Sequence, residues 1–420
     1  MADSNPSEIK FAGETSIDSV KIITTDGFAQ DITAQVINIQ IFEDISSPFI
    51  TGSFVLKDML DLPNLFPFRG QEFVELSVTT PGLPRGNIRS RFYIYKMSNR
   101  QLIGDRSVVY QLHFTSEETI VDLNKKISKV FTGNVAELVP QFIKSSTGLE
   151  SKKNTVVEAT TNNIKYISNM WSPVRNLLFL AENAKSAAPN FVFFENRDGF
   201  YFVSLDTLYT QDLYQEFTYD NYTRDSGENG KDYRNITRDF KRITEINVPV
   251  AYDYMDRISS GMIASKAVSY DVTHKRYTVR NYNLVDKFNT TNHLNPYPPV
   301  SGSIIYRANA AHLTYPRMTN QFNGFGDTSN FDTFQQRISL INSSESGSIE
   351  IVVPGRCDYT AGQKVSINLH KNQPTSDKDI DITDRMFSGF YLISALNHYI
   401  TREGHECRML LIKDSSQLKV

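Results

Sequence analysis

Cysteine is scarce in this sequence, since only Cys357 and Cys407 occur among its 420 residues. They lie too far apart to form a C-x-x-C metal-binding knuckle. Two cysteines do not make a disulfide framework either, which fits assembly in a reducing compartment. We expect both residues to be buried, reduced thiols.

Long apolar runs are also missing. No stretch approaches the roughly 20 apolar residues that a membrane-spanning helix needs. The N-terminus reads MADSNPSEIKFAGE, without the basic flank and apolar run of a secretory signal. We therefore expect a soluble protein that is made in a cytoplasm and has no membrane partner.

Neither sign of charge is in excess, because the formal net charge is only -3. A protein that binds duplex DNA usually carries a clear basic excess or a basic patch. Nucleic acid is therefore not an obvious partner, although a net charge does not exclude a local basic stripe.

The motifs of common catalytic and metal sites are absent. The sequence contains no H-E-x-x-H and no G-x-S-x-G. Gly324-Phe325-Gly326 lacks the third glycine and the following helix of a phosphate-binding loop. Seven histidines are scattered along the chain; only His398 and His405, which flank an expected hairpin turn, can approach each other, and a surface or packing role is expected for them. The histidines are His113, His274, His293, His312, His370, His398 and His405.

Two pairs of acidic residues are spaced closely enough to be considered for glycoside hydrolysis, which needs two carboxylates at a set separation. They are Glu195 with Asp198, and Asp253 with Asp256. Asp198 belongs to an Asp-Gly turn, and turn chemistry explains it without catalysis. We therefore expect no catalytic, cofactor-binding or metal-binding residues, and no cofactor.

Aromatic residues, by contrast, are abundant, with 27 Phe and 21 Tyr, which favours β-strands. Residues 17–115 alternate between polar and apolar positions. The run QVINIQIFED places Ile37, Ile39 and Ile41 on one face. Further strands are expected at TGSFVLKD, QEFVELSVTT, RFYIYKMS and SVVYQLHFTS, with turns at Ser47-Pro48, Pro81-Gly82 and Gly104-Asp105. Several short strands at such spacing predict a small barrel or sandwich, and we assign residues 17–115 to a first β-barrel.

Residues 116–206 change to a helical period and predict a mixed α/β domain. Thr115 and Glu118 resemble a capping box before an apolar stripe at Ile120, Leu123, Ile127 and Val130. A second helix is expected from Asn134, and a third from Ser172-Pro173. A hairpin with an Asp-Gly turn at 196–199 follows.

The remaining segments complete the expected organisation of an α+β, β-rich chain. Residues 1–16 are polar and are expected to form a flexible arm. Residues 207–237 are rich in tyrosine and are expected to be a connector. Residues 258–345 are expected to be an inserted domain. The strand pattern of 238–257 and 346–415 predicts a second, discontinuous β-barrel.

The two β regions align with each other. FRGQEFVELSV and RFYIYKMSNRQLIGDRSVVYQLHFTSEE correspond to TAGQKVSINL and GFYLISALNHYITREGHECRMLLIKDSS. In this alignment Gly70-Gln71 matches Gly362-Gln363, and Phe92-Tyr93-Ile94 matches Phe390-Tyr391-Leu392. The strands that end near Phe114 and Ile412 also match in length. We interpret this as an internal duplication of one antiparallel β-barrel.

The order of these parts resembles the baseplate hub proteins of T-even-type contractile-tail bacteriophages, over roughly residues 20–415. The stretches that carry the resemblance are VINIQIFEDISSPFITGSFVLKD, WSPVRNLLFLAENAK, FVFFENRDGFYFVSLDTL, PVAYDYMDR and FYLISALNHYITREGHECRMLLIKDSS. Segments 207–236 and 258–345 do not match.

The resemblance implies a non-catalytic structural protein of the virion tail baseplate, assembled in the host cytoplasm. Such hubs are homotrimeric rings whose six barrels give pseudo-sixfold symmetry. They join a sixfold tail tube to a trimeric central spike and leave an axial channel for the genome. The implied partners are the chain itself, the spike, the tube or tube-initiator proteins, surrounding baseplate proteins and, as a further candidate, the tape measure protein. DNA is implied only in transit.

Two other functions stay open. A tail-associated cell-wall hydrolase would need the acidic pairs above. A tail-tip carbohydrate-binding module would need exposed aromatic platforms, for which Tyr209, Tyr214, Tyr219, Tyr222 and Tyr233 are the candidates. Protein interfaces are equally rich in tyrosine, so we favour an interface.

Overall fold

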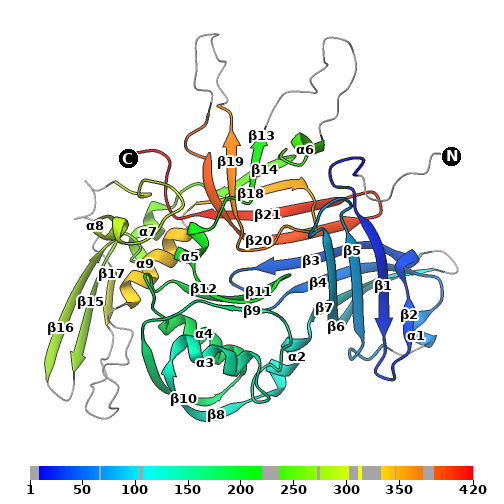
Figure 1. Cartoon of the computed structure of the whole chain (residues 1–420), viewed down its shortest axis with the longest axis horizontal. Coiled ribbons are helices and arrows are strands. Elements are labelled where there is room, and N and C mark those ends of the chain that lie inside the picture. The colour runs from blue at the N-terminus through cyan, green and yellow to red at the C-terminus, as the bar shows by residue number, and fades with distance from the viewer. Residues whose placement is uncertain are drawn as a thin grey trace, which may run out of the picture.

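The computed structural model describes residues 9–65, 68–103, 107–219, 236–271, 275–301, 311–314, 333–345, 347–371 and 383–419 (Figure 1). The turn expected at Gly104-Asp105 and the glycines at 324 and 326 lie outside these ranges. Residues 9–15 were expected in a flexible arm, but Gly13 is fixed through its carbonyl oxygen, which accepts a hydrogen bond of 2.8 Å from the backbone of His405.

Strands dominate the described chain and confirm the prediction of a β-rich fold. In chain order they are β1 (Ser16–Ile23), β2 (Ala29–Asp31), β3 (Val36–Asp44), β4 (Thr51–Asp58), β5 (Phe73–Thr79), β6 (Asn87–Leu102), β7 (Val108–Ser116), β8 (Ile127–Asn134), β9 (Thr155–Val157), β10 (Asn163–Trp171), β11 (Phe191–Asn196), β12 (Gly199–Ser204), β13 (Gln215–Tyr219), β14 (Glu245–Val250), β15 (Ala264–Asp271), β16 (Arg276–Asn283), β17 (Ala311–Thr314), β18 (Gly347–Pro354), β19 (Lys364–Leu369), β20 (Gly389–Thr401) and β21 (His405–Lys413).

The helices are short. They are α1 (Leu62–Leu65), α2 (Glu117–Asn124), α3 (Val135–Ile143), α4 (Pro173–Asn183), α5 (Leu205–Thr210), α6 (Ile236–Asp239), α7 (Tyr254–Ser259), α8 (Leu284–Lys287) and α9 (Phe334–Ser344), with 3-10 turns η1 (Thr33–Gln35) and η2 (Phe288–Thr290). Among the described residues, no helix has the length and apolar character needed to cross a bilayer.

One large sheet organises the molecule. Eleven of its strands lie in the order β14-β18-β21-β20-β3-β4-β7-β6-β5-β1-β2, and β13 and β19 pair beside β20. In Figure 1, β20 and β21 lie next to β3 and β4, so the C-terminal and N-terminal parts of the chain meet in the middle of the sheet.

Alternate side chains of β3 face the first core, with one difference from the prediction. Ile39 and Ile41 are buried as expected, but Ile37 is exposed and Val36 is buried. The cause is a bulge in the β3–β4 pairing between Val36 and Asn38, which reverses the facing of the residues before it.

The same order of strands occurs twice in this sheet. One set reads β3-β4-β7-β6-β5-β1, and the other reads β14-β18-β21-β20-β19-β13. Each set covers its own cluster of buried apolar residues, one around Phe54, Phe92 and Phe114, the other around Tyr391, Met409 and Leu411.

Rows of paired residues align the two sets position by position. In the first set, Met97 on β6 pairs with Leu112, which pairs with Phe54, which pairs with Ile39 on β3. In the second, the corresponding row runs through four residues that also lie over a core: Leu396 on β20, Met409, Ile351 and Ile246 on β14.

The alignment that we drew from the sequence is shifted by one residue from these rows. Both long strands carry a bulge, after Ile94 in β6 and after Ile393 in β20. The Ile94 amide donates to the Glu72 carbonyl, and the Ile393 amide donates to the Gln363 carbonyl.

The bulges and these bonds therefore match Ile94 with Ile393 and Glu72 with Gln363, not Gln71 with Gln363 or Ile94 with Leu392. A shift of one residue moves every side chain to the other face of a strand, and Leu392 indeed faces away from the core that Ile393 joins.

The two sets differ at their last strand. β1 runs antiparallel to β5, whereas β13 runs parallel to β19. Within the described ranges no strand pairing closes either set into a barrel. β13 also lies inside the span expected as a connector, and its Phe217 is fully buried in the second core.

Residues 116–206 combine two small sheets with helices, and some of their predicted elements are confirmed. Asn134 caps α3 by accepting the Ala136 amide, Ser172 caps α4, and β11 and β12 form the hairpin. The helix expected across Ile127 and Val130 is wrong, because Ile127–Asn134 is strand β8 paired with β10.

The capping box expected from Thr115 and Glu118 does not form. The residue before α2 is Ser116, which makes no side-chain cap bond. The Glu118 carboxylate instead binds Lys153 at 2.6 Å.

Candidate assembly interface

The most informative part of the sheet is the junction between the two strand sets. β20 uses one edge for two neighbours. Its first residues pair with β19, and residues Ala395–Thr401 pair antiparallel with Asp44–Asn38 of β3. The fourth strand of the second set therefore extends past its own neighbour and binds the first strand of the other set.

In the other copy of this strand order, β6 corresponds to β20 and β14 corresponds to β3. The matching edges of β6 and β14 have no such neighbour among the described residues. β6 pairs with β5 only up to Tyr93, and beyond that point it pairs only with β7. β14 pairs only with β18. Exposed apolar side chains follow both edges: Tyr95 and Leu102 are 48% and 80% exposed, and Val250 is 45% exposed. Unpaired edges of this kind are templates for pairing with another chain.

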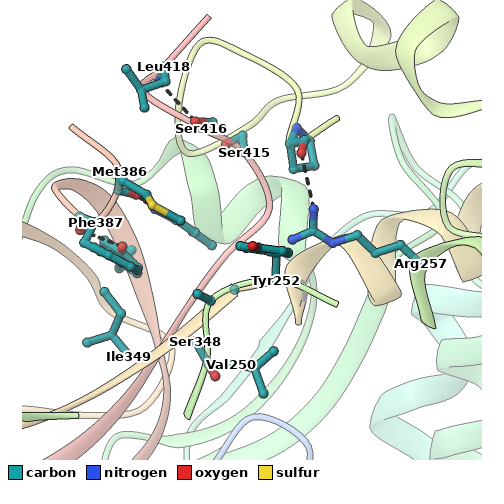
Figure 2. A pocket seen from close by; sticks show the side chains of 15 residues that line it. Val250, Tyr252, Arg257, Ser348, Ile349, Met386, Phe387, Ser415, Ser416 and Leu418 are labelled. Atoms are coloured by element: carbon teal, nitrogen blue, oxygen red, sulfur yellow. Dashed lines mark hydrogen bonds between the residues drawn. The ribbon is translucent and has the colours of Figure 1, made fainter. Parts of the chain in front are cut away.

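A hollow of about 270 Å³ lies beside the end of β14 (Figure 2). Val250, Tyr252, Met386 and Leu418 contribute exposed apolar surface to it. Arg257 lies at its rim and donates a hydrogen bond of 3.3 Å to the Pro299 carbonyl. This surface has the mixed apolar and polar character of a protein contact.

The solvent-facing side of the junction is hollowed. Its lining comes from β14, β18, β21, β20 and β3 and combines apolar side chains with Asn247, Glu350, Arg408, Asn397 and Asp44. The charged residues of this lining are mostly acidic, since Asp44, Glu245 and Glu350 outnumber Arg408.

A buried carboxylate fixes β3 at the junction. Glu43 is 2% exposed and accepts the backbone amides of Arg197 and Ala361, both at 2.9 Å. Burial raises the pKa of Glu43 to about 7, although the two amides oppose the shift. Glu43 thereby joins β3 to the β11–β12 turn and to the loop before β19.

Glu195, considered above as an acid, lies in a second buried cluster. Its carboxylate is 2.6 Å from the Lys153 ammonium and accepts hydrogen bonds from the Ile50 amide and the Ser116 hydroxyl. Lys153 also binds Glu118 at 2.6 Å. Burial raises the pKa of Glu195 despite Lys153. The side chain is only 1% exposed, so it joins β11 to the residue before β4, to the end of β7 and to the loop before β9.

The other acidic candidates have local structural partners. Asp198 lies in the β11–β12 turn, 3.6 Å from Arg85 and 3.4 Å from Arg197. Asp253 caps α7 by accepting the Asp256 amide at 3.0 Å. Glu195 and Asp198 line one hollow of about 600 Å³, but each carboxylate is engaged there by a basic side chain: Lys153 binds Glu195, and Arg85 and Arg197 lie near Asp198.

The histidines separate into distinct environments. His113 is hydrogen bonded to Ser98, and His293 lies 2.5 Å from Asp414. His398 and His405 do approach each other, and both are buried rather than on the surface. His274 and the side chain of His312 lie outside the described residues.

Part of the expected tyrosine platform is not exposed. Tyr209 is only 3% exposed. Tyr219 packs against the second core. Tyr214 is 36% exposed, and its hydroxyl donates to Asp358 at 2.6 Å. Tyr222 and Tyr233 lie outside the described residues. Tyr209 and Tyr219 thus support the fold, and Tyr214 is the exposed candidate among the described tyrosines.

Sequence reasoning missed the residues that make the junction. The β20–β3 pairing joins strands from opposite ends of the chain, and no local pattern reports such a contact. The signal that was present is the length of β6 and β20, since each is longer than its partner β5 or β19 and must extend past it.

Comparisons with known proteins agree on the fold. The sequence matches no family model and no curated protein sequence. The tail protein from Neisseria meningitidis MC58 superimposes with a TM-score of 0.55 at 11% identity, covering 94% of this chain and 96% of that one. The 43 kDa tail protein of prophage MuSo2 from Shewanella oneidensis gives 0.56 at 7% identity, covering 94% and 98%. The chain therefore has the fold of these two tail proteins.

Proposed function

We propose that this chain is the structural hub of a contractile phage tail. Three copies would form a ring of six similar strand sets that joins a sixfold tail tube to a threefold central spike. The fold shared with two tail proteins supports a tail role, and the sequence resemblance to T-even-type hubs supports this particular one.

The observation that carries the proposal is the β20–β3 junction. Within one chain, β20 of the second set pairs with β3 of the first set. If the two sets are equivalent, the same contact can form between two chains. The strand β6, which corresponds to β20, would then pair with β14 of the neighbouring copy, which corresponds to β3. Both edges are unpaired among the described residues; β6 exposes Tyr95 and Leu102, and β14 exposes Val250.

The paired rows specify the register of this contact. Ser98 in the first set corresponds to Asn397 in the second set. Ser98 pairs with Gln111 and Asn397 pairs with Arg408, and both pairs lie one position along from the aligned rows. Val250 occupies the place of Phe42, since these pair with Ser348 and Thr51. Asn397 pairs with Phe42 inside the chain. Ser98 of one copy should therefore lie opposite Val250 of the next.

Such a head-to-tail contact joins two different surfaces, and it forms a ring only if its rotation closes. Three chains with two sets each would present six similar edges to a sixfold tube. The segments that occur once per chain, such as α7–α9 with β15–β17, would keep threefold symmetry for the spike. Duplication within a trimer thus solves a symmetry mismatch that a trimer of single sets would leave.

The hollowed junction face would then line an axial channel. Its charged side chains are mostly acidic, so DNA could pass without the multiple phosphate contacts that give tight, salt-dependent binding. We also propose that the chain is not an enzyme, because its best-placed acid, Glu195, is held in a buried ion pair. Clearing of purified peptidoglycan by the wild type that disappears in Glu195→Gln would contradict this part.

Cross-linking tests the ring directly. The variant with Ser98→Cys and Val250→Cys should form disulfides between copies on oxidation and give bands of two and three chains on a denaturing gel. Cys357 and Cys407 are fully buried and should not interfere. Light scattering should give three times the chain mass of 47.8 kDa.

Three controls accompany this experiment. Either cysteine alone should stay monomeric on the denaturing gel. The variant with Phe42→Cys and Asn397→Cys should form its disulfide within one chain. This result would confirm that the oxidation works at the β20–β3 contact, on which the predicted contact between chains is based. The ring would be ruled out if the protein stayed monomeric at micromolar concentration and gave no cross-links between chains, while the Phe42→Cys and Asn397→Cys pair still oxidised.

A further inference from the structure

Three potential metal ligands converge inside the β20–β21 hairpin. His398 lies on β20, and His405 and Cys407 lie on β21. The distance between His398 Nδ1 and His405 Nε2 is 3.0 Å, and Cys407 Sγ lies 3.4 Å from each of these nitrogens. The three ligand atoms thus form a nearly equilateral triangle.

The three side chains are buried together. Each is at most 2% exposed. A neutral imidazole and a thiolate are the forms that bind a metal, so the Cys407 proton must be displaced when a metal binds.

The triangle has the dimensions of a tetrahedral zinc site. Zinc binds imidazole nitrogen at about 2.0–2.1 Å and thiolate sulfur at about 2.3 Å, which separates neighbouring ligand atoms by about 3.3–3.6 Å. The observed separations of 3.0 and 3.4 Å come close to these values. Simple packing does not require three such atoms to point at one place.

The surrounding backbone is shaped to hold the His405 ring. A Cβ atom at Gly355 would lie 2.2 Å from this ring, so only glycine leaves room for it. The Gly355 amide donates to the His405 carbonyl at 2.7 Å, and the His405 amide donates to Gly13 at 2.8 Å. The cluster thus lies where β18, β21 and the N-terminal segment meet.

We propose that His398, His405 and Cys407 bind one zinc ion that clamps the β20–β21 hairpin next to the β20–β3 junction. A mixed nitrogen and thiolate set favours zinc over magnesium or calcium, which prefer oxygen ligands. The carbonyl oxygen of Arg356, 4.0 Å from Cys407 Sγ, is a candidate for the fourth position. The site is structural, since it is closed to solvent.

Metal analysis of the full-length chain tests this proposal. The protein should be produced without a histidine tag in zinc-supplemented medium and should retain about one zinc per chain after dialysis. Refolding with Co²⁺ in place of zinc should give the visible bands of tetrahedral cobalt and a thiolate-to-cobalt charge-transfer band in the near ultraviolet. Unfolding with a chelator and refolding without metal should lower the melting temperature.

Variants assign the ligands. Cys407→Ser should abolish the charge-transfer band, and His398→Gln should lower the zinc content at least tenfold. His113→Gln, which changes a histidine outside the cluster, should change neither. The wild-type measurements do not depend on whether a variant folds. Wild-type protein without zinc, and with no thiolate band after refolding with cobalt, would show that the cluster is only hydrogen bonded and would overturn the proposal.

Discussion

A Lys153→Met variant is expected to lose about 3 kcal/mol of unfolding free energy at neutral pH. Lys153 binds Glu118 and Glu195 at 2.6 Å each, and the Glu195 side chain is only 1% exposed. Methionine keeps the length and apolar stem but leaves the Glu195 carboxylate buried without its cation. The loss lies at the low end for a broken buried ion pair, because Lys153 itself keeps 33% of its side chain exposed.

The loss should shrink as the pH falls. Burial already raises the pKa of Glu195 in the native chain, and removal of Lys153 raises it further. The folded variant therefore takes up a proton that the unfolded chain binds only near pH 4.5. Its stability should rise as the pH is lowered toward that value, relative to the wild type. Urea unfolding at pH 8 and pH 5.5 measures the difference.

Lys152→Met is the matched control, since Lys152 is the exposed neighbour. It should change stability by no more than about 0.5 kcal/mol. Equal losses for both variants, or a loss at Lys153 that does not depend on pH, would show that Glu195 does not rely on this cation.

Local chemistry in the sequence was enough to predict several elements. The α4 helix begins at Ser172-Pro173 because the hydroxyl caps the helix and proline suits its first turn. The β11–β12 hairpin follows from its Asp-Gly turn. The stripe at Ile127 and Val130 failed because β8 has one solvent-facing side, where Val130 is half exposed. A short apolar run does not distinguish a strand from a helix.

The internal repeat shows the limit of alignment by residue type. The sequence matched glycine with glycine and Phe92 with Phe390, and both matches were one residue off. Hydrogen bonds and bulges, which fix Ile94 to Ile393, decide the register instead. Glycine positions are less constrained by the core than the alternating apolar side chains, so facing direction is the better criterion for such repeats.

The convergence of His398, His405 and Cys407 was only half visible in the sequence. The hairpin turn between the two histidines predicts that they approach each other. The contribution of Cys407 follows from strand geometry, because residues two apart on β21 face the same side. The deep burial of all three depends on β18 and β3, which lie far away in the sequence, and so was not predictable locally.

A Glu43→Gln variant is expected to remove part of the pH dependence of stability. The pKa of Glu43 is raised by burial to about 7 from an ordinary value of 4.5. The folded chain therefore holds a proton that the unfolded chain releases between about pH 4.5 and 7. Stability should fall as the pH rises through this window, by up to about 3 kcal/mol.

Glutamine at this position stays neutral at every pH, so this fall should be absent in the variant. The amide offers only one acceptor oxygen, however, while Glu43 accepts two backbone amides, from Arg197 and Ala361. The variant should therefore be about 1–3 kcal/mol less stable than the wild type at pH 5, and the two stabilities should converge or cross by pH 8. Thermal unfolding across this range measures both effects.

The exposed carboxylate of Glu403, in the turn between β20 and β21, provides the matched control, and Glu403→Gln should leave the pH profile unchanged. Because Glu43 fixes β3 against the β11–β12 turn and the loop before β19, its ionisation acts on the junction that the proposed ring repeats. If Glu43→Gln retains the full wild-type slope between pH 5 and 8, the proton is held elsewhere, and the junction is not the part of the fold that senses pH.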